Sequence, residues 1–529
     1  MRRKALILIA LGLLAGAAIG GTFLVLSLTG SSERAALLQR AHGLVGAVPH
    51  PKRIRFKTHL SLPKLSALAI KRFERTGLNE KLPPTPVRAE ERPVVSSSFP
   101  QTQVAVGARS LRFTRRALVN TGHAGFIAEP DIATNGRRVM ITWNDGAAFS
   151  NDGGRTFTFA DPAKIFAPAH GGFCCDQSVV YDPRQDIWIW VLQYWADDSG
   201  NIIRLAIAHG DSGFDQRLFH QIDISPTTFG WSSTAEFDYP DAGLTDANFF
   251  LTVNAYDKND YDGTLVLRIP LTDLAAASPT IANALHAKTD DSSAALAAGA
   301  RDTMYFASHV DTARLRLWGW PDSSTSITSY VITHTRYPYS PFLPYHCGRT
   351  GGPATGDWCE RRLSSGTPTN DDRPTTAWVA NGVIGVAWNA QQSRAQGFPY
   401  PFVMVVRIDE GTKSLIDEPF IWNRKYAFEY LDVTPNATGD LGGLVLEGGG
   451  RDYENCVAMA RRANTGSRSP WLARLADPSD HDPTEAKAGD YLGASPASIG
   501  GNAWSGTCYT IHRGRGPQHV GIRFFSFGL

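Results

Sequence analysis

The sequence lacks the concentrated positive charge that nucleic-acid binding requires. Its formal net charge is +2 at pH 7. Beyond the first four residues, only a modest run from Lys52 to Lys57 is rich in Lys and Arg. Nucleic-acid-binding domains carry a basic patch or stripe that matches the phosphate backbone. We therefore expect no nucleic-acid partner.

The sequence also lacks the short motifs of several enzyme classes. It contains no G-x-S-x-G, no H-E-x-x-H, no P-loop and no G-x-G-x-x-G placed between a strand and a helix. Readings as a serine hydrolase, a zinc protease or a nucleotide-binding protein are therefore unsupported. No C-x-x-C pair is present either, so we assign no metal ligands.

Helical patterns are scarce after residue 104, whereas turn-forming residues are common, with 50 Gly and 32 Pro in the chain. Short β-like segments recur, each followed by a turn rich in Gly, Asp or Asn and then by a more apolar strand. The units begin near Phe126, Gln177, Glu236, Ser292, Arg373, Glu429 and Asp490. This spacing fits four-stranded blades and predicts an all-β fold, a six- or seven-bladed β-propeller with seven preferred, over residues 104–529.

A propeller must also close its ring. The segment from Val104 to Phe113 is β-like and precedes the first unit. We expect it to supply the outer strand of the last blade, whose own strands end at Phe524 to Phe527.

The first residues are suited to membrane insertion. Met1 to Lys4 is basic, and Ala5 to Leu28 carries no charge. About 20 apolar residues span a bilayer, whereas the core of a signal peptide has ~7–15. We expect residues 1–29 to be a transmembrane anchor, with a cleaved signal segment as the alternative. Either reading exports the chain and places the propeller on the periplasmic or extracellular side of the membrane.

Residues 30–103 are expected to form a stalk and a Pro-rich linker. Ser31 to Arg34 is a candidate helix cap and predicts a short helix from Ala35 to about Ala41. Five prolines and three serines fall between residues 82 and 103, which is typical of a linker.

The six cysteines fit an exported chain, because disulfides persist in oxidising compartments. The expected pairs are Cys347 with Cys359, which flank a Gly-rich loop, and Cys456 with Cys508, in neighbouring repeats. The adjacent Cys174 and Cys175 form a vicinal disulfide, remain free thiols or cross-pair with the other loop.

One segment carries a family resemblance. Residues 150–157 read Ser-Asn-Asp-Gly-Gly-Arg-Thr-Phe and fit S-x-D-x-G-x-T-F/W at every defined position. A carboxylate accepts backbone N–H bonds inside such a turn, and glycine permits a positive φ. Here the chain resembles the Asp-box (BNR-repeat) sialidase-like β-propeller superfamily. The resemblance implies a turn between the third and fourth strands of the first unit, away from the active face, and a structural role for Ser150, Asp152, Gly154, Thr156 and Phe157.

The resemblance does not extend to the chemistry of sialidases. True sialidases usually carry several Asp boxes, and this chain has one. The family implies an arginine triad that grips a substrate carboxylate, a Tyr/Glu nucleophile pair and an acidic Asp. Its first arginine precedes the first box, whereas Arg268-Ile269-Pro270 follows the box here. We therefore do not carry sialidase activity over.

Polar residues at the starts of the inner strands of a propeller converge on the central channel. This arrangement predicts an acidic mouth made of Glu129, Asp131, Asp176, Glu236, Asp238, Asp241, Glu429, Asp432 and Asp490, with Arg373 beside them. These side chains either cap strands and solvate the channel or form a functional site. Carboxylates around a wet channel also suit Ca²⁺.

Glycoside hydrolysis needs two carboxyl groups, ~5–5.5 Å apart in retaining enzymes and ~6.5–9.5 Å apart in inverting ones. Glu236 and Asp238 alternate along one strand and are expected to face the same side. Glu429 and Tyr430 are candidates for a Tyr/Glu nucleophile arrangement. Asp176 completes the set of candidate catalytic residues.

The candidate ligand-binding residues lie in two loops or directly beside them. The loop from Thr335 to Asp372 is the longest break in the strand pattern, and long loops are commonly functional. Aromatic rings stack on sugars, and arginines clamp carboxylates or phosphates. The candidates are Arg361, Arg362, Trp358 and His346 in this loop, Arg373 just after it, and His170 in the loop before the second unit. His170 is a candidate acid/base group, with ordinary hydrogen bonding in the loop as the alternative.

Two functions remain open. The chain is predicted to be an extracytoplasmic, membrane-anchored propeller that recognises a glycan, and whether it also hydrolyses the glycan is left open. The alternative is a non-catalytic platform for protein interaction or envelope assembly. A deep acidic pocket with a carboxyl group of raised pKa favours the first, and a plugged channel favours the second.

Overall fold

The computed structural model describes residues 37–40, 53–55, 102–119, 128–258, 260–340, 345–347, 372–450, 452–463, 469–481, 489, 491–513 and 519–529. Ala36–Leu529 forms one compact unit. Within the described ranges, no helix is both long and apolar enough to cross a membrane. The predicted anchor, residues 1–29, lies outside the described residues.

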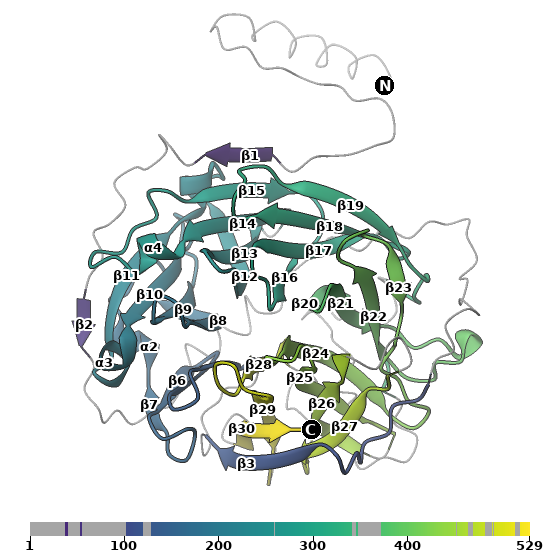
Figure 1. Ribbon diagram of the computed structural model, residues 1–529. Coiled ribbons are helices and arrows are strands. Elements are labelled where there is room, and N and C mark those ends of the chain that lie inside the picture. The colour runs from purple at the N-terminus through teal and green to yellow at the C-terminus, as the bar shows by residue number, and fades with distance from the viewer. Residues whose placement is uncertain are drawn as a thin grey trace, which may run out of the picture. The chain divides into compact units, whose positions relative to one another are not determined.

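Antiparallel β-strands make up nearly all the regular structure of the described residues (Figure 1). Strand β9 (Ile187–Tyr194) shows why. It reads Ile-Trp-Ile-Trp-Val-Leu-Gln-Tyr and is buried along its whole length. Successive side chains of a strand point to opposite faces, so a strand that is apolar on both faces packs between two other sheets.

The first three sheets each contain four consecutive strands, paired antiparallel in sequence order. The first sheet contains β4 (Asp131–Thr134), β5 (Val139–Trp143), β6 (Gly146–Ser150) and β7 (Thr158–Ala160). The second contains β8 (Phe173–Asp182), β9, β10 (Ile203–His209) and β11 (Leu218–Ile224). The third contains β12 (Ala235–Leu244), β13 (Asn248–Asp257), β14 (Asp260–Pro270) and β15 (Leu285–Thr289).

An eight-stranded sheet follows, and it consists of two antiparallel halves. The first half contains β16 (Ala295–Ala298), β17 (Thr303–Asp311), β18 (Arg314–Pro321) and β19 (Thr328–Thr333). The second half contains β20 (Pro374–Ala380), β21 (Val383–Ala390), β22 (Phe402–Asp409) and β23 (Leu415–Asp417). A short parallel pairing of β16 with β20 joins the halves.

Two further four-stranded sheets complete the set in the described residues. One contains β24 (Ala427–Pro435), β25 (Leu441–Gly449), β26 (Asp452–Arg461) and β27 (Leu472–Asp477). The other contains β28 (Gly493–Pro496), β29 (Ala503–Ile511), β30 (Val520–Gly528) and, from near the other end of the chain, β3 (Arg112–Leu118).

The pairing of β3 with β30 confirms that an N-terminal segment closes the last sheet. Strand β3 begins at Arg112, so it overlaps the predicted range, Val104 to Phe113, only at the end of that range. The earlier residues pair with the neighbouring sheet instead, where Val106 forms a parallel bridge with Ala473.

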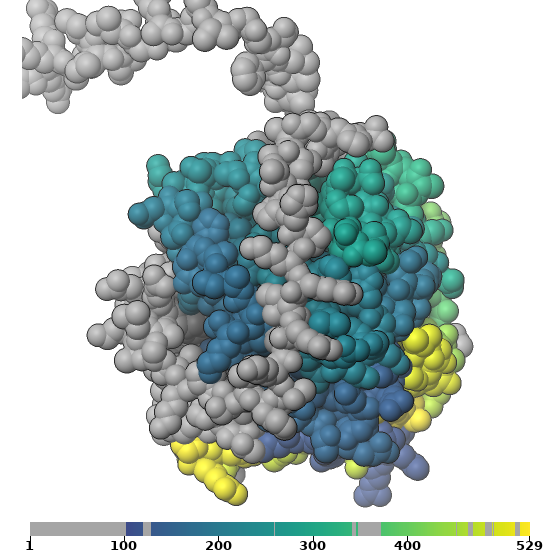
Figure 2. Space-filling model, turned by 90° about the vertical axis from the view of Figure 1, so that its left-hand side faces the viewer, coloured from purple at the N-terminus to yellow at the C-terminus, as the bar shows by residue number. Residues whose placement is uncertain are grey.

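The innermost strands form a closed ring. They contact one another in the order β4, β8, β12, β16, β20, β24 and β28, and β28 contacts β4. Radial four-stranded sheets around such a ring make a β-propeller, as predicted. Figure 2 shows residues of the β8–β11 and β12–β15 sheets side by side at the outside of the ring, in blue and teal.

Two short strands add to the outside of the ring. Strand β1 (Leu37–Arg40) pairs with β15, and β2 (Arg53–Arg55) pairs with β11. The helix predicted from Ala35 to about Ala41 is therefore wrong for Leu37–Arg40. A helix this short is marginal in water, whereas an added strand satisfies its backbone groups along an existing sheet edge.

Helices in the described residues are short and lie in connections between strands. The α-helices are α2 (Pro162–Ile165), α3 (Gly210–Asp215) and α4 (Leu271–Leu274). The 3-10 helices are η1 (Pro226–Phe229) and η2 (Arg394–Gln396).

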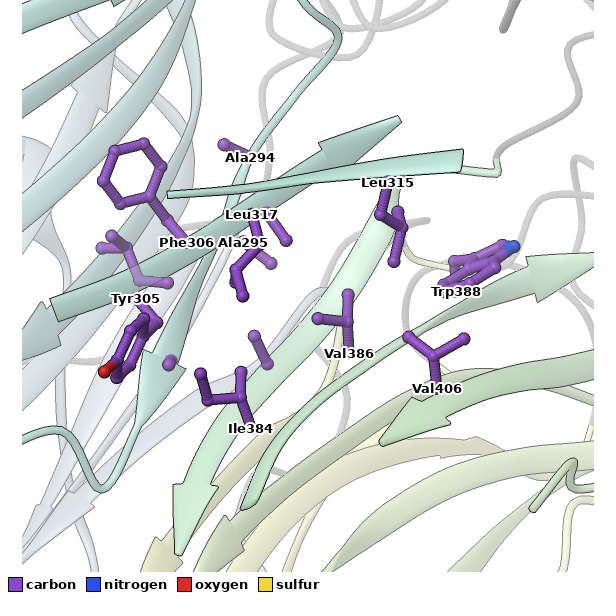
Figure 3. Close-up of a cluster of buried hydrophobic side chains, with 14 of the residues drawn as sticks. Ala294, Ala295, Tyr305, Phe306, Leu315, Leu317, Ile384, Val386, Trp388 and Val406 are labelled. Carbon is purple, nitrogen blue, oxygen red and sulfur yellow. The ribbon is translucent and has the colours of Figure 1, made fainter. Parts of the chain in front are cut away.

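Apolar side chains fill the space between neighbouring sheets. Figure 3 shows one such layer, where Ala295 and Leu317 of one half-sheet face Val386 and Val406 of the next. Trp388, in the same layer, is fully buried. Burial of each large apolar side chain contributes about 1.5–3 kcal/mol, so these layers hold the inner strands in fixed positions around the centre.

Candidate functional site

A cavity of about 490 Å³ lies between the innermost strands, and β4, β8, β12, β16, β20, β24 and β28 all contribute to its lining. The lining extends from Tyr239, in the middle of β12, and Tyr491, just before β28, to turns after the ends of the innermost strands, such as those at Gly299 and Asn436. Ligand sites commonly have volumes of ~300–1,000 Å³. The cavity is therefore large enough for a small ligand.

Three aspartates from different sheets line the cavity: Asp131 on β4, Asp241 on β12 and Asp432 on β24. Each accepts a backbone N–H from the innermost strand of the next sheet. The donors are Val179 N to Asp131 Oδ2 at 2.8 Å, Leu296 N to Asp241 Oδ2 at 2.8 Å, and Ala494 N to Asp432. These bonds tie neighbouring sheets together at the centre of the ring.

The three carboxyl groups ionise less readily than ordinary aspartates. Burial raises the pKa of Asp131 to about 6. Burial, together with the nearby charge of Asp131, raises the pKa of Asp241 to about 7. Burial and the charges of the other two raise the pKa of Asp432 to about 8. Near pH 7 the cavity therefore contains both a carboxylate and a protonated carboxyl group, so it can accept and donate hydrogen bonds.

Each of these aspartates comes two residues after a residue with a left-handed backbone. Glu129, Tyr239 and Tyr430 have φ angles of 45°, 53° and 57°. Register shifts on β12 and β24 place the two tyrosines in β-bulges. Such conformations are costly for residues other than glycine and are frequent near functional sites, where bulges redirect side chains. A residue with a left-handed backbone conformation thus precedes each of the three cavity aspartates by two positions.

Side chains from distant sheets meet at the Tyr239 end of the cavity. The rings of Tyr239 and Tyr491 lie 5.7 Å apart and pack edge to face. The guanidinium of Arg373 lies 3.9 Å from the centre of the Tyr239 ring. Gln177 N donates to Tyr491 Oη at 3.2 Å. Burial, then the charges of Asp176 and Glu129, raise the pKa of Tyr491 well above its usual value, so its hydroxyl stays protonated.

The five predicted catalytic residues are not among the described residues that line the cavity. Glu236 is exposed on β12, and partial burial of its carboxyl raises its pKa. Asp238, on the same strand, accepts a bond of 2.6 Å from Gln193 Nε2.

The other three predicted catalytic residues lie on β8 and β24. Glu429 and Tyr430 are each 2% exposed, and Tyr430 N donates to Asn389 Oδ1 at 2.8 Å. Asp176 lies near enough to Tyr491 for its charge to raise the pKa of the Tyr491 hydroxyl. A catalytic role for Glu236, Asp238, Glu429, Tyr430 and Asp176 stays a prediction.

Apart from His170, the predicted ligand-binding residues are Arg373, His346 and a group of three from the long loop. Arg373 is buried against Tyr239. His346 is exposed, and its backbone N donates to Gln392 Oε1 at 3.0 Å. The group of three, Arg361, Arg362 and Trp358, lies outside the described residues.

His170 does not belong to a Ser-His-Asp triad. Its Nδ1 lies 3.2 Å from Asp197 Oδ1 and 3.3 Å from Ser199 Oγ. In a triad the serine and the aspartate contact opposite nitrogens of the ring. Here both contact the same nitrogen, and the serine hydroxyl donates to the aspartate. This arrangement fits the hydrogen-bonding role that the sequence offered as the alternative.

The Cys456–Cys508 bridge is present, and of the three alternatives for Cys174 and Cys175 the structure has the vicinal disulfide. The vicinal Cys174–Cys175 bridge lies in β8, at an irregularity where three residues face one residue of β9. The Cys456–Cys508 bridge joins β26 to β29 and thus links neighbouring sheets, as predicted. Cys347 is also disulfide-bonded, and its predicted partner Cys359 lies outside the described residues.

The predicted turn at residues 150–157 joins β6 and β7. Its hydrogen bonds run to Asp152 from Arg155 N, Thr156 N and Thr156 Oγ1, at 2.7–2.9 Å, and to Ser150 Oγ from Gly154 N at 2.8 Å. Gly154 has a φ of 78°, which suits glycine. The ring of Phe157 packs against Phe524 of β30, 5.7 Å away. The turn therefore also joins the first sheet to the last.

No three His, Cys, Asp or Glu side chains form a group suited to a metal ion in the part of the chain that the structure describes. Calcium in the channel stays a prediction.

Sequence reasoning placed Asp131, Asp241 and Asp432 in the acidic mouth without assigning them a role, and it did not single out Tyr239 or Tyr491. A signal was present in the repeated spacing of Glu-Pro-Asp at 129–131, Tyr-Pro-Asp at 239–241 and Tyr-Leu-Asp at 430–432. The meeting of Tyr239 and Tyr491 had no such signal, because it depends on the closure of the ring.

Comparison with known proteins gives similarity of fold alone. The sequence matches no family model and no curated protein. The structure is similar to a Penicillium chrysogenum alpha-L-arabinanase complexed with arabinobiose, at 9% identity, covering 78% of this chain and 98% of that chain, with a TM-score of 0.36.

Two further solved structures are similar at the same level. One is the Trypanosoma rangeli sialidase in complex with sialic acid, at 8% identity, covering 68% of this chain and 55% of that chain, with a TM-score of 0.35. The other is the WD40 domain of SCAP from fission yeast, at 10% identity, covering 75% and 82%, with a TM-score of 0.31. These values carry no argument about activity or ligand.

Proposed function

We propose that this protein is a seven-bladed propeller, held at the outer side of a membrane by its N-terminal segment, that recognises an uncharged glycan in its central cavity. The count of seven follows when the two halves of the eight-stranded sheet are taken as two blades. Anchoring and export rest on the basic and apolar residues 1–29.

The chemistry of the cavity lining carries this proposal. Its charged groups, among the described residues, are Asp131, Asp241 and Asp432, and its lining contains no Lys, Arg or His. The remaining polar groups are hydroxyls and amides, such as Thr376 and Asn436. Sugar hydroxyls both donate and accept hydrogen bonds, which matches a mixture of carboxylates, carboxylic acids and hydroxyls. An anionic sugar would meet like charge without a compensating cation.

Recognition without hydrolysis fits the cavity best. Asp131 already accepts bonds from Ile132 N, Ser178 Oγ and Val179 N, which leaves little of its carboxylate for attack on a substrate. Hydrolysis is a second candidate, and one observation favours it. With pKa values of about 6 and about 8, Asp131 is mostly ionised and Asp432 mostly protonated at pH 7, as a base and an acid must be.

A glycan array probed with the full chain, purified in detergent under oxidising conditions, tests recognition. We expect binding to neutral glycans and none to sialylated ones. Of the three cavity aspartates, Asp432 has the most strongly raised pKa. Asp432→Asn removes this ionisable group, and we expect at least tenfold weaker binding. Asp198→Asn, at an exposed turn, is the matched control and is expected to bind normally. No binding to any glycan would contradict the proposal and direct the search to a protein partner.

A turnover assay on the bound glycans separates the two candidates. If hydrolysis occurs and is lost in Asp131→Asn and Asp432→Asn but kept in Glu236→Gln, the cavity is catalytic. If it is lost in Glu236→Gln or Glu429→Gln, the strand starts are catalytic, as the sequence predicted. Binding without turnover supports recognition alone.

A further inference from the structure

One end of the central cavity is closed by side chains that cross the ring. Tyr239 lies on β12, and Tyr491 lies two residues before the start of β28. These strands are separated in the ring by β8 and β4 on one side and by β16, β20 and β24 on the other. A contact of 5.7 Å between the two rings is therefore a contact across the centre.

Two further contacts hold this closure in place. Arg373, just before β20, stacks on Tyr239 at 3.9 Å, although β16 separates β20 from β12. Gln177 of β8 donates to Tyr491 Oη, although β4 separates β8 from β28. Tyr239 is 9% exposed and Arg373 is 2% exposed, so little of either side chain reaches solvent.

The opposite end of the cavity reaches the surface. Its lining there consists of turn residues after the innermost strands, among them Gly299, Ala437, Ser498 and Ile499. Ile499 is 62% exposed, and Ala437 is also exposed. Most of these side chains are small, so they leave an opening between the turns.

We propose that the cavity is a blind pocket, entered from the face where the innermost strands end, and that it takes the terminal unit of an uncharged saccharide chain. A closed end cannot pass a chain through, so an internal stretch of a polymer does not fit. Arg373, which the sequence offered as a ligand-binding residue, acts as a positioning residue for Tyr239. The nature of the ligand rests on the proposed function, whereas the direction of entry does not.

Cysteine labelling tests the direction of entry without any saccharide. No free cysteine is found among the described residues. The wild-type chain, labelled in parallel, measures any background from Cys359, which lies outside them. In the full chain, Ser498→Cys places a thiol at the opening, and Ala494→Cys places one in the middle of the cavity. We expect iodoacetamide to label both. A maleimide on a bulky polyethylene glycol should label Ser498→Cys and should react at least tenfold more slowly with Ala494→Cys.

A third position tests the closed end. Pro240→Cys lies beside Tyr239, and we expect the bulky maleimide to label it at least tenfold more slowly than Ser498→Cys. Circular dichroism and the melting temperature verify folding, and Leu492→Cys serves as a second position at the same end if Pro240→Cys does not fold. Labelling at the closed end that is as fast as at Ser498→Cys would overturn the proposal, and so would an Ala494→Cys that iodoacetamide does not reach.

A saccharide arm separates this proposal from the proposed function. A neutral saccharide that binds on the array should protect Ala494→Cys from iodoacetamide. If no saccharide binds but the order of labelling holds, the proposed function fails and the blind pocket stands. If a saccharide binds and leaves Ala494→Cys unprotected, recognition stands and its place in the cavity is overturned.

Discussion

Asp152 illustrates how one side chain organises a turn. Burial alone would raise the pKa of its carboxyl, but the hydrogen bonds from Thr156, Ser150 and Arg155 hold that pKa below the ordinary range. In Asp152→Ala two backbone N–H groups lose their acceptor, and we expect the free energy of unfolding to fall by about 1–3 kcal/mol. Urea denaturation measures the change. Asp198→Ala, at another exposed turn, is the control, and an equal loss there would contradict the argument.

A comparison of two aspartates shows which hydrogen bonds the sequence could predict. The partners of Asp152 lie within four residues, so a local pattern contains the whole turn. Asp131 has the same residue type, but its partners Ser178 and Val179 are 47 and 48 residues away. Only the closed ring brings them together. From the sequence alone, a carboxylate that joins two sheets therefore could not be distinguished from one that faces solvent.

At the scale of elements, the Cys456–Cys508 bridge joins two strands across a sequence separation of 52 residues. Cross-links that close long loops stabilise most, and a loop of this length corresponds to about 3–4 kcal/mol. We expect the double variant Cys456→Ala/Cys508→Ala to lose that much free energy of unfolding. The double variant Cys174→Ala/Cys175→Ala removes a bridge that closes no long loop, so a similar loss in both would contradict this reasoning.

Strand β3 is the element on which the closure of the last sheet depends. A chain that begins at residue 120 lacks β3 and leaves one edge of β30 unpaired, although the other edge still pairs with β29. Strand β30 contains the buried Phe524, Phe525 and Phe527. Exposed apolar edges associate with one another. We expect this chain to aggregate on size-exclusion chromatography, whereas a chain that begins at residue 102 stays monodisperse. Equal behaviour of the two chains would show that β3 is dispensable.

Elements were predictable where they depend on local pattern. The apolar run of β9 and the turn between β6 and β7 follow from the residues themselves. The strand at Leu37–Arg40 was predicted as a helix because its sequence carries a cap signal, and its pairing with β15 is not visible in the sequence. The bulges at Tyr239 and Tyr430 were missed for a related reason, since their positive φ angles are sustained by the surrounding ring.

For the whole molecule, the buried carboxyl groups link stability to pH. Burial raises the pKa of Asp241, Asp432 and Glu447 to about 7, about 8 and about 7, from an ordinary value near ~4. Between these limits the folded chain holds protons that the unfolded chain releases. The stability from these groups is fully present below about pH 4 and is lost as the pH rises through each folded value.

Two buried histidines act in the opposite direction at lower pH. Burial lowers the pKa of His309 to about 3 and that of His334 to about 4. The stability that they contribute is present above ~6.5, the ordinary histidine value, and is lost as the pH falls below it. The histidines therefore lower stability as the pH falls, and the carboxyl groups lower it as the pH rises. We expect the melting temperature to be highest at an intermediate pH, where neither loss is complete.

The clearest test lies above pH 6.5, where the carboxyl groups dominate. Asp432 alone should cost on the order of 1–2 kcal/mol of unfolding free energy between pH 6.5 and pH 8.5, because its pKa near 8 lies within that interval. The melting temperature of the full chain should fall over this interval. Asp432→Asn cannot ionise and should fall less, whereas Asp198→Asn should follow the wild type. If the melting temperature stays constant or rises, or if Asp432→Asn falls equally, the cavity aspartates are ionised in the folded protein at neutral pH. The cavity would then hold no carboxyl group that donates a hydrogen bond, and the proposal of an uncharged glycan would lose its electrostatic basis.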